Sequence, residues 1–169
     1  MRILTVNTMD RSGGAEKIAS DLVSRFRNTG HPTTFAVGRK RGGIADIEFP
    51  QDREYLPKNS IAPRPAGKNK RNVEYSKGVE DFNFPGTWDL LNLESEQADL
   101  LHLHNLHGGY FDLRALPWLS KQLPTVLTLH DAWLTSGHCA HSIDCDRWLN
   151  GCGECPDLEI YPSIPTDGT

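Results

Sequence analysis

The sequence predicts a single α/β domain in which helices flank a parallel sheet. Three short apolar runs, at residues 2–7, 99–104 and 125–129, each end in polar residues, as buried strands of a parallel sheet do. A glycine turn and a helical pattern separate the first run from the next strand, which makes a strand–helix–strand unit. At 169 residues, 37% of them apolar, the chain is long enough for one such domain and too short for two large ones.

The first strand, residues 2–7, is followed by a turn at Gly13 and Gly14. A helix should begin at Ala15, because apolar residues then recur at the spacing of one helical face. Those residues are Ala15, Ile18, Ala19, Leu22, Val23 and Phe26. A second strand is predicted at residues 33–37, and the whole unit indicates a Rossmann-like sheet.

Residues 46–83 predict no regular element, because four prolines and a basic run interrupt any periodicity. We expect a long loop or insertion there, and loops of that length are usually functional or disordered. The basic residues 68–71, with Arg39, Lys40 and Arg41, are most simply a solvated surface. Contact with an anionic lipid surface or with a phosphate-bearing acceptor is the alternative.

Regular structure resumes with the strand at residues 99–104, and a helix is predicted at residues 110–121 before the strand at 125–129. Open parallel sheets bind ligands beyond the carboxyl ends of their strands. Residues 7–14, 104–109 and 130–131 follow three such ends and should line one cleft. Within the middle segment, the candidate substrate-binding side chains are His104, Asn105 and His107.

Composition restricts the partners. Against 22 acidic side chains the chain has 18 basic ones, and the net charge of −4 argues against a nucleic-acid partner. No stretch approaches the roughly 18 apolar residues of a membrane span, and the N-terminus leads into a strand pattern without the apolar core of a signal peptide. We therefore expect a cytoplasmic protein, with peripheral contact at the inner face of the membrane as a further option.

The glycine pair is a candidate ligand-binding turn. Gly13 and Gly14 precede a helix, so their backbone N–H groups should be free to bind a phosphate or a sugar hydroxyl. The pair matches neither the dinucleotide pattern G-x-G-x-x-G nor a P-loop. Taken alone, a plain tight turn is an equally good interpretation.

Histidines form the next candidate group. His102 and His104 lie two apart on a predicted strand and so share one face, with His107 just beyond. Such a pair could bind a metal ion, or it could line a polar cleft as hydrogen-bonded histidines. Because no carboxylate partner is evident nearby in the sequence, we favour the cleft.

All four cysteines fall in a Cys-rich loop, residues 138–156, with the spacing C-x5-C-x6-C-x2-C. In a reducing compartment such clusters are more often metal ligands than disulfides. The C-x2-C pair favours tetrahedral zinc in a closed, structural site, with unpaired or disulfide-bonded cysteines as the alternative. The predicted ligands are Cys139, Cys145, Cys152 and Cys155, and His138 or His141 could replace one of them.

Three stretches carry a family resemblance: SGGAEK after the first strand, DLLHLHNLHGGY in the middle, and LTLHDAWLTSGHCAHSIDCDRWLNGCGECP. Together they resemble the family-four retaining glycosyltransferases of the GT-B fold, of the colanic-acid and exopolysaccharide type. The resemblance covers residues 1–162 and is weakest over residues 46–83. Its most specific part is the His-Asp pair followed by tryptophan and the cysteines.

The resemblance implies the N-terminal, acceptor-binding half of such an enzyme. It places Gly13 and Gly14 near the donor phosphates and the acceptor, and His130 in contact with the transferred sugar. Asp131 would orient His130 or bind sugar hydroxyls. His130 and Asp131 are thus the candidate catalytic residues, although retention by front-side attack requires no protein nucleophile.

In the family, a second domain holds the nucleotide sugar through an Arg, a Lys and a Glu-x7-Glu pair, and nothing after Pro156 matches them. The implied partners are a nucleotide-sugar donor, a saccharide or lipid-linked saccharide acceptor, and a C-terminal domain. We expect the 169 residues to be inactive by themselves.

Two other functions remain open from the sequence. A metal-dependent hydrolase would use His102, His104 and His130 around a catalytic ion, although no Asp or Glu stands at a convincing ligand spacing near the first two. A zinc-stapled binding module without catalysis is the third function class.

Overall fold

The computed structural model describes residues 1–48, 68–79, 83–93 and 96–169. The described strands form one five-stranded sheet in the order β3-β2-β1-β4-β5, and every neighbouring pair is parallel. Their bounds are β1 Ile3–Met9, β2 Thr33–Arg39, β3 Ile47–Glu48, β4 Leu100–Leu103 and β5 Thr125–Leu127. The predicted fold class, a Rossmann-like parallel sheet with flanking helices, is confirmed.

The strand order reverses beside β1. From β1 the chain moves outward through β2 to β3, and it then returns to pair β4 with the other side of β1. Ile3 accordingly pairs with Thr33 on one side and with Leu100 on the other. Open α/β sheets bind ligands at such a reversal, outside the carboxyl ends of the strands.

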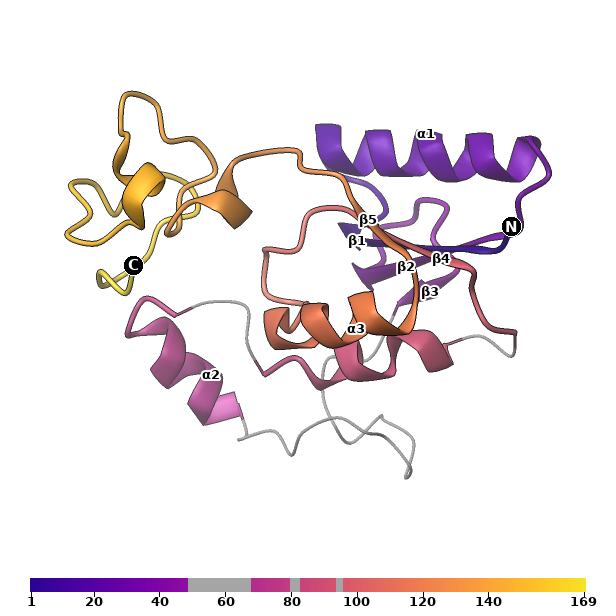
Figure 1. Ribbon diagram of the computed structural model, residues 1–169, viewed down its shortest axis with the longest axis horizontal. Helices are drawn as coiled ribbons and strands as arrows, with labels where there is room; N and C mark the ends of the chain where they lie inside the picture. Colours follow the sequence, from indigo (N-terminus) through magenta and orange to yellow (C-terminus); the bar gives the residue numbers. More distant parts are fainter. Residues whose placement is uncertain (49–67, 80–82, 94–95) are drawn as a thin grey trace.

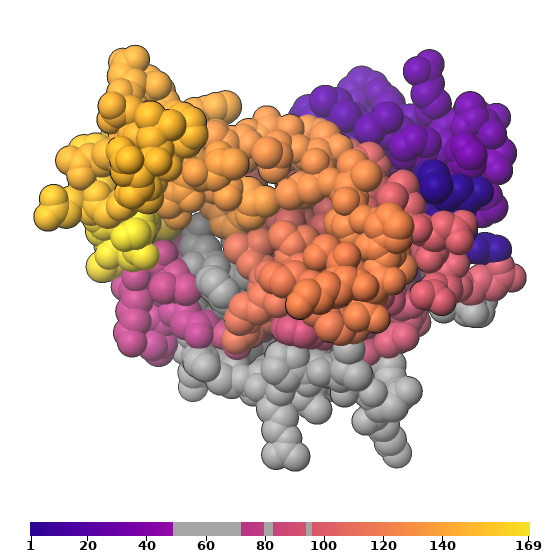
Figure 2. All heavy atoms as spheres, viewed as in Figure 1, coloured from indigo at the N-terminus to yellow at the C-terminus, as the bar shows by residue number. Residues whose placement is uncertain are grey.

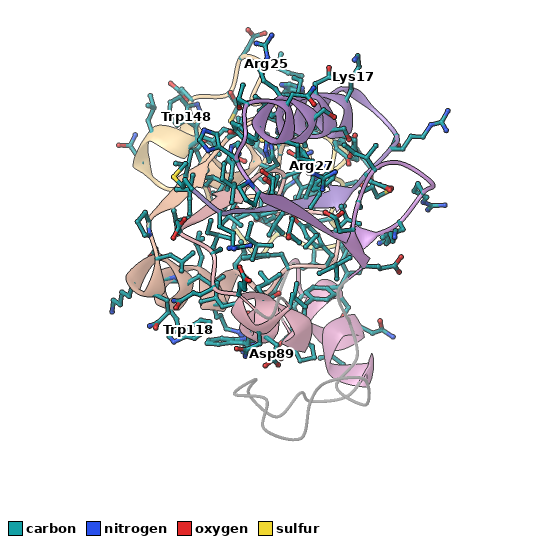
Figure 3. All side chains as sticks on the ribbon, turned by 90° about the vertical axis from the view of Figure 1, so that its right-hand side faces the viewer. Lys17, Arg25, Arg27, Asp89, Trp118 and Trp148 are labelled. Carbon is teal, nitrogen blue, oxygen red and sulfur yellow. The ribbon has the colours of Figure 1, made fainter. Side chains whose placement is uncertain are left out.

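Helices cover both faces of the sheet (Figure 1). Helix α1, Gly14–Asn28, lies on one face, and α3, Leu116–Gln122, lies on the other together with the 3₁₀ helix Pro85–Asn92. In the view turned by 90° (Figure 3), the labelled side chains separate in the same way: Lys17, Arg25 and Arg27 on the α1 side, Asp89 and Trp118 on the opposite side.

The two faces of the central strands differ in chemistry. Because successive strand residues point to opposite faces, Leu4 and Val6 of β1 share one face with Leu101 and Leu103 of β4. These leucines and valine belong to the main apolar core, which also contains Leu90, Tyr110, Phe111, Ala115 and Leu119. The α1 side of the same strands carries most of their buried polar residues, Thr5, Asn7, His102 and His104, together with the apolar Ile3 at the start of β1.

Helix α1 agrees closely with the predicted helix. Ala19 and Val23 are fully buried and pack with Phe35 and Val37 of β2. Ile18, which was also predicted to face the core, is 48% exposed. At 3.6 residues per turn it lies about 100° around the helix from Ala19, outside the buried stripe.

The helix predicted at residues 110–121 begins later than expected. A 3₁₀ turn, Leu113–Ala115, precedes α3, and Asp112 caps it by accepting a hydrogen bond from the backbone N–H of Arg114 at 3.1 Å. An N-terminal cap of this kind starts the helix after the aspartate. Residues 110–111 are instead non-helical, and both side chains are buried in the core.

Two short elements lie within the predicted loop at residues 46–83: strand β3, Ile47–Glu48, and helix α2, Lys68–Tyr75. Residues 49–67 and 80–82 of that stretch lie outside the described residues. After α2 the chain turns at Gly78, which has a φ of +76° and leaves no room for a side chain beside the backbone of Thr166 and Gly168. The end of α2 therefore contacts the C-terminal residues.

Residues 136–169 form a lobe at one end of the molecule (Figure 2). It is reached through the 3₁₀ turn Trp133–Thr135 and contains another, Arg147–Asn150. In the described parts of the chain, no helix has the length and apolar character that crossing a bilayer requires.

Candidate functional site

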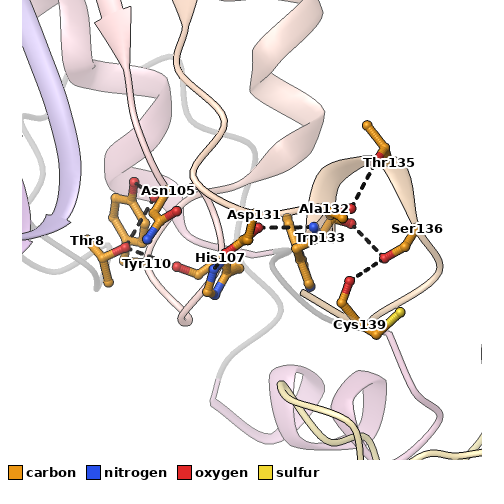
Figure 4. A network of polar contacts seen from close by, with 10 residues as sticks. All are labelled: Thr8, Asn105, His107, Tyr110, Asp131, Ala132, Trp133, Thr135, Ser136 and Cys139. Carbon is orange, nitrogen blue, oxygen red and sulfur yellow. Dashed lines mark hydrogen bonds and ion pairs between the residues drawn. The ribbon is translucent and has the colours of Figure 1, made fainter. Parts of the chain in front are cut away.

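The end of β1 and the segment after β4 are joined by hydrogen bonds (Figure 4). The Thr8 hydroxyl lies 3.1 Å from the carbonyl oxygen of Asn105 and 3.2 Å from that of His107. The Tyr110 hydroxyl donates to the same Asn105 carbonyl. Gly108 has a φ of +100°, and a Cβ there would lie only 3.0 Å from the Thr8 methyl group. The loop after β4 is thus held against the end of β1.

His104 and His130 form the first histidine pair of the site. The Nδ1 atom of His104 lies 2.9 Å from Nε2 of His130, and the rings are stacked with centroids 5.2 Å apart. His104 is fully buried, whereas His130 is partly exposed. Burial, and to a lesser extent the adjacent rings of His102 and His130, lower the pKa of His104 to about 3. His104 is therefore neutral at ordinary pH.

His102 lies behind this pair, toward α1. Its Nε2 is 2.8 Å from the Thr128 hydroxyl, and its ring contacts Phe26 of α1 at a centroid distance of 6.0 Å. Burial, followed by the proximity of His130, lowers the pKa of His102 as well. The predicted interpretation of His102 and His104 as hydrogen-bonded histidines agrees with these contacts.

His107 and Asp131 form the second pair. His107 Nε2 is 3.0 Å from Asp131 Oδ2, and the aspartate's other oxygen accepts a hydrogen bond from the Trp133 backbone N–H at 3.0 Å. The His107 ring also packs on Trp133, with centroids 5.3 Å apart. The carboxylate of Asp131, which could have oriented His130, instead contacts His107 and the backbone N–H of Trp133. The side chain that contacts His130 is His104.

The glycine turn lies at the same edge of the sheet, since α1 begins where β1 ends (Figure 1). The Gly13 N–H was expected to be free, but it donates to the carboxylate of Glu16 at 2.8 Å, so this expectation is wrong. The space beside Gly14 is open, with no heavy atom within 4 Å of where a Cβ would stand. Of the two glycines, Gly14 is therefore the one with open space beside it.

The described residues line two hollows near this edge. The smaller is a shallow one of about 10 Å³ lined by both histidine pairs, and its walls include His104, Asn105, His107, His130, Asp131 and Trp133. The larger, a cavity of about 310 Å³, lies between the end of α2 and the C-terminal lobe and is lined by Gly78, Val79, Leu113, Trp133, Leu134, Ser136, Gly137, His138 and Gly168. Trp133 and Leu134 line both hollows and so lie between them.

The predicted zinc site is not supported. All four cysteines, Cys139, Cys145, Cys152 and Cys155, are free thiols. The Cys152 sulfur accepts a hydrogen bond from the Gly137 N–H at 3.1 Å, and the Cys155 sulfur lies 3.3 Å from His138 Nε2. Each of these two thiols therefore contacts a different residue.

A metal site at the histidines is not supported either. Throughout the described ranges, no three or more His, Cys, Asp or Glu side chains are grouped so as to hold a metal ion. The trio His102, His104 and His130, which the hydrolase alternative would need, is therefore not arranged as a ligand set.

The comparisons with known proteins identify the family. The chain matches the family model described as Glycosyltransferase Family 4 over residues 12–151. This protein belongs to glycosyltransferase family 4. The match contains the glycine turn and both histidine pairs, so the family resemblance deduced from the motifs is confirmed.

A curated protein whose name is that of a glycosyltransferase is also similar to this chain. The chain is 27% identical, over an alignment 179 positions long, to the Escherichia coli (strain K12) protein named "Putative colanic acid biosynthesis glycosyl transferase WcaC". The alignment covers 99% of this chain but 42% of that relative, so the chain spans less than half of the relative's length. No solved structure matches the chain.

Sequence reasoning missed three residues that shape the site. Thr8 joins two strand ends, and Asp10 accepts the backbone N–H groups of Arg41 and Gly43 at 2.6 and 2.8 Å. No sequence pattern distinguishes either residue. Glu16 does follow Gly13 at the spacing of a capping box, and that spacing could have predicted the occupied N–H.

Proposed function

We propose that this chain is the acceptor-binding part of a retaining glycosyltransferase that moves a sugar from a nucleotide-sugar donor to a saccharide or lipid-linked saccharide acceptor. The observation that carries the proposal is the pairing of His104 with His130 and of His107 with Asp131 at the carboxyl edge of the sheet. Membership of glycosyltransferase family 4 and the relative named for colanic acid biosynthesis support polysaccharide synthesis as its setting.

His130 has the position required of a sugar-contacting residue. It is partly exposed in the smaller hollow and is held from behind by His104. The Asp131–His107 pair forms the neighbouring wall, and the open start of α1 at Gly14 suits the donor phosphates. Asn105 lines the same hollow and adds an amide that can bind a hydroxyl.

We place the acceptor in the larger cavity. Its volume of about 310 Å³ is at the lower end of the usual range for small-molecule pockets. Trp133 lines both hollows and supplies an aromatic surface against which a sugar ring could pack. An acceptor hydroxyl bound there would be adjacent to the sugar held at His130.

The nucleotide of the donor would be bound by a C-terminal domain that faces this edge of the sheet. The relative is more than twice as long as its aligned part, which leaves room for such a domain. Residues 1–169 would then bind the acceptor without turnover. We assign the reaction to the cytoplasm, at the inner face of the membrane when the acceptor is lipid-linked.

The test is transfer by the full-length gene product. It is incubated with a panel of nucleotide sugars and with saccharide or lipid-linked acceptors, and the product is identified by mass spectrometry and its anomeric configuration by NMR. His130→Ala should lower turnover on the order of 100-fold, the usual cost of one transition-state contact. His141→Ala, the same change at an exposed histidine of the lobe, should leave turnover unchanged. Equal turnover in the two variants would remove His130 from the site.

A further inference from the structure

The hydrogen bond between His104 and His130 can be donated by either ring. Two imidazole nitrogens 2.9 Å apart share one hydrogen, so one ring donates and the other accepts. Because this contact uses Nε2 of His130, its Nδ1 is the nitrogen left for a ligand. The direction of the shared hydrogen bond therefore decides whether His130 offers the substrate an N–H or a bare nitrogen.

The direction depends on His104, which is neutral and so has a single N–H. Burial and the adjacent rings of His102 and His130 keep the pKa of His104 near 3. If the proton is on Nδ1, His104 donates to His130. If it is on Nε2, His130 must donate to His104. What surrounds Nε2 of His104 therefore sets the tautomers of both rings.

Asn7 is the side chain next to His104 that can accept a hydrogen bond from its Nε2. His104 donates its backbone N–H to the Val6 carbonyl at 2.9 Å, and Val6 pairs in register with Leu103. Asn7 and His104 are therefore adjacent on one face of the sheet. The Asn7 amide is fixed, since its Nδ2 donates to the Met9 carbonyl at 2.8 Å, and its Oδ1 can act only as an acceptor.

Three atoms on this face are buried without a hydrogen-bond partner among the described residues: Thr5 Oγ1, Asn7 Oδ1 and His104 Nε2. A proton on His104 Nδ1 would leave two of them as acceptors, with only the Thr5 hydroxyl to supply a hydrogen. A proton on Nε2 supplies a donor for Asn7 Oδ1 without requiring the Thr5 hydroxyl. Buried polar groups are nearly always satisfied, directly or through an ordered water, which favours the second arrangement.

Asn7 Oδ1 and His104 Nε2 are not directly hydrogen-bonded to each other. We propose that His104 carries its proton on Nε2, shared with Asn7 Oδ1 through an ordered water, and accepts at Nδ1 from His130, so that His130 presents an unprotonated Nδ1 to the substrate. Asn7 and His104 are thus positioning residues. A bare nitrogen accepts a hydrogen bond from a sugar hydroxyl and gives none to a phosphate oxygen. This assignment of the ligand group rests on the proposed function, whereas the tautomers themselves do not.

The decisive experiment needs no substrate. Long-range ¹H–¹⁵N correlation spectra of ¹⁵N-histidine-labelled protein, at about pH 8 where histidine is neutral, show which ring nitrogen carries the proton. We expect the Nε2–H tautomer for both His104 and His130, with the signals assigned by comparison with His104→Gln and His130→Gln. A proton on Nδ1 of either ring overturns the proposal.

The role of Asn7 is tested by Asn7→Leu, which removes the acceptor and keeps the branching of the side chain. His130 should then shift at least partly to the Nδ1–H form. Asn92→Leu, the same change at an exposed position of the Pro85–Asn92 helix, should leave both tautomers unchanged. A folded Asn7→Leu protein with an unaltered His130 tautomer would overturn the role of Asn7. If that variant does not fold, the spectrum of the unmodified protein still decides the tautomers.

Donor analogues give a second readout in the full-length enzyme. Fluorine can accept a weak hydrogen bond but cannot donate one. Against a bare Nδ1, the deoxy and deoxyfluoro donors should lose kcat/KM alike, by about tenfold or more, the cost of one hydrogen bond. Partial recovery with fluorine would mean that His130 donates, and would overturn the proposal. If no donor is used at all, the proposed function fails while the tautomer result stands.

Discussion

The two faces of strands β1 and β4 differ although they share one backbone. The side toward α3 presents Leu4, Val6, Leu101 and Leu103, all at most 2% exposed. The side toward α1 begins with Ile3 and then presents Thr5, Asn7, His102 and His104, all at most 6% exposed. Apolar burial stabilises a fold, whereas a buried polar group costs free energy unless it is hydrogen-bonded. The difference suggests that one face maintains the fold and the other builds the site.

The largest expected effect belongs to the apolar face. Leu103→Ala removes a fully buried side chain from the main core and should lower the free energy of unfolding by about 2–5 kcal/mol. Urea unfolding followed by circular dichroism measures it. Leu149→Ala, at a leucine of the lobe that is 62% exposed, is the matched control and should change stability by less than about 0.5 kcal/mol. A similar loss in both variants would contradict the assignment of stability to this face.

The polar face should make the fold sensitive to acid. The pKa of His104 is about 3 in the folded protein, and the pKa of His102 is also lowered, whereas both are near 6.5 in the unfolded chain. Below about pH 6.5 the unfolded state therefore binds protons that the folded state does not. Stability should be complete above that pH and fall toward pH 3, by at most about 1.4 kcal/mol per pH unit for each histidine.

The variant His104→Gln isolates this contribution. It keeps a polar side chain but removes one titrating group, so the free energy of unfolding should depend less steeply on pH between about 6.5 and 4. His141→Gln, at an exposed histidine, should retain the original slope. Equal slopes in unmodified protein and His104→Gln would show that His104 is not kept neutral by the fold.

A smaller effect is expected where the polar face meets the lobe. Asp131→Asn weakens the contact with His107 and the cap on the Trp133 N–H, which together should cost about 1–2 kcal/mol. Hydrogen–deuterium exchange should rise at residues 131–136 and remain unchanged in α1. Asp144→Asn, at an exposed aspartate of the lobe, is the control. Uniform exchange across the chain would indicate that the pair does not anchor this turn.

Much of the fold could be predicted from the sequence because periodicity reports which side of an element is buried. It predicted β1, α1, β2, β4 and β5. It did not predict the two-residue strand β3, which is too short to show a period, or the late start of α3, which depends on a cap at Asp112.

The site was predictable in location and only partly in its contacts. The rule for parallel strands indicated that His104, His107 and His130 would lie at one edge. It could not indicate that Asp131 would pair with His107, because that depends on how two loops fold back. Cysteine spacing likewise did not predict that Cys155 would contact His138 while Cys152 bonds to Gly137.

The smallest expected effect also separates the two faces most sharply. Thr5 is fully buried, and its hydroxyl has no hydrogen-bond partner among the described residues. Thr5→Val keeps the branched shape and removes that hydroxyl, so the free energy of unfolding should stay the same or rise by up to about 1 kcal/mol. Val6→Thr makes the reverse change on the apolar face of the same strand and should cost about 1–3 kcal/mol, because it buries a hydroxyl among apolar side chains. If both substitutions were destabilising to the same degree, the hydroxyl of Thr5 would be satisfied in solution, and the polar face would contribute to stability as the apolar face does.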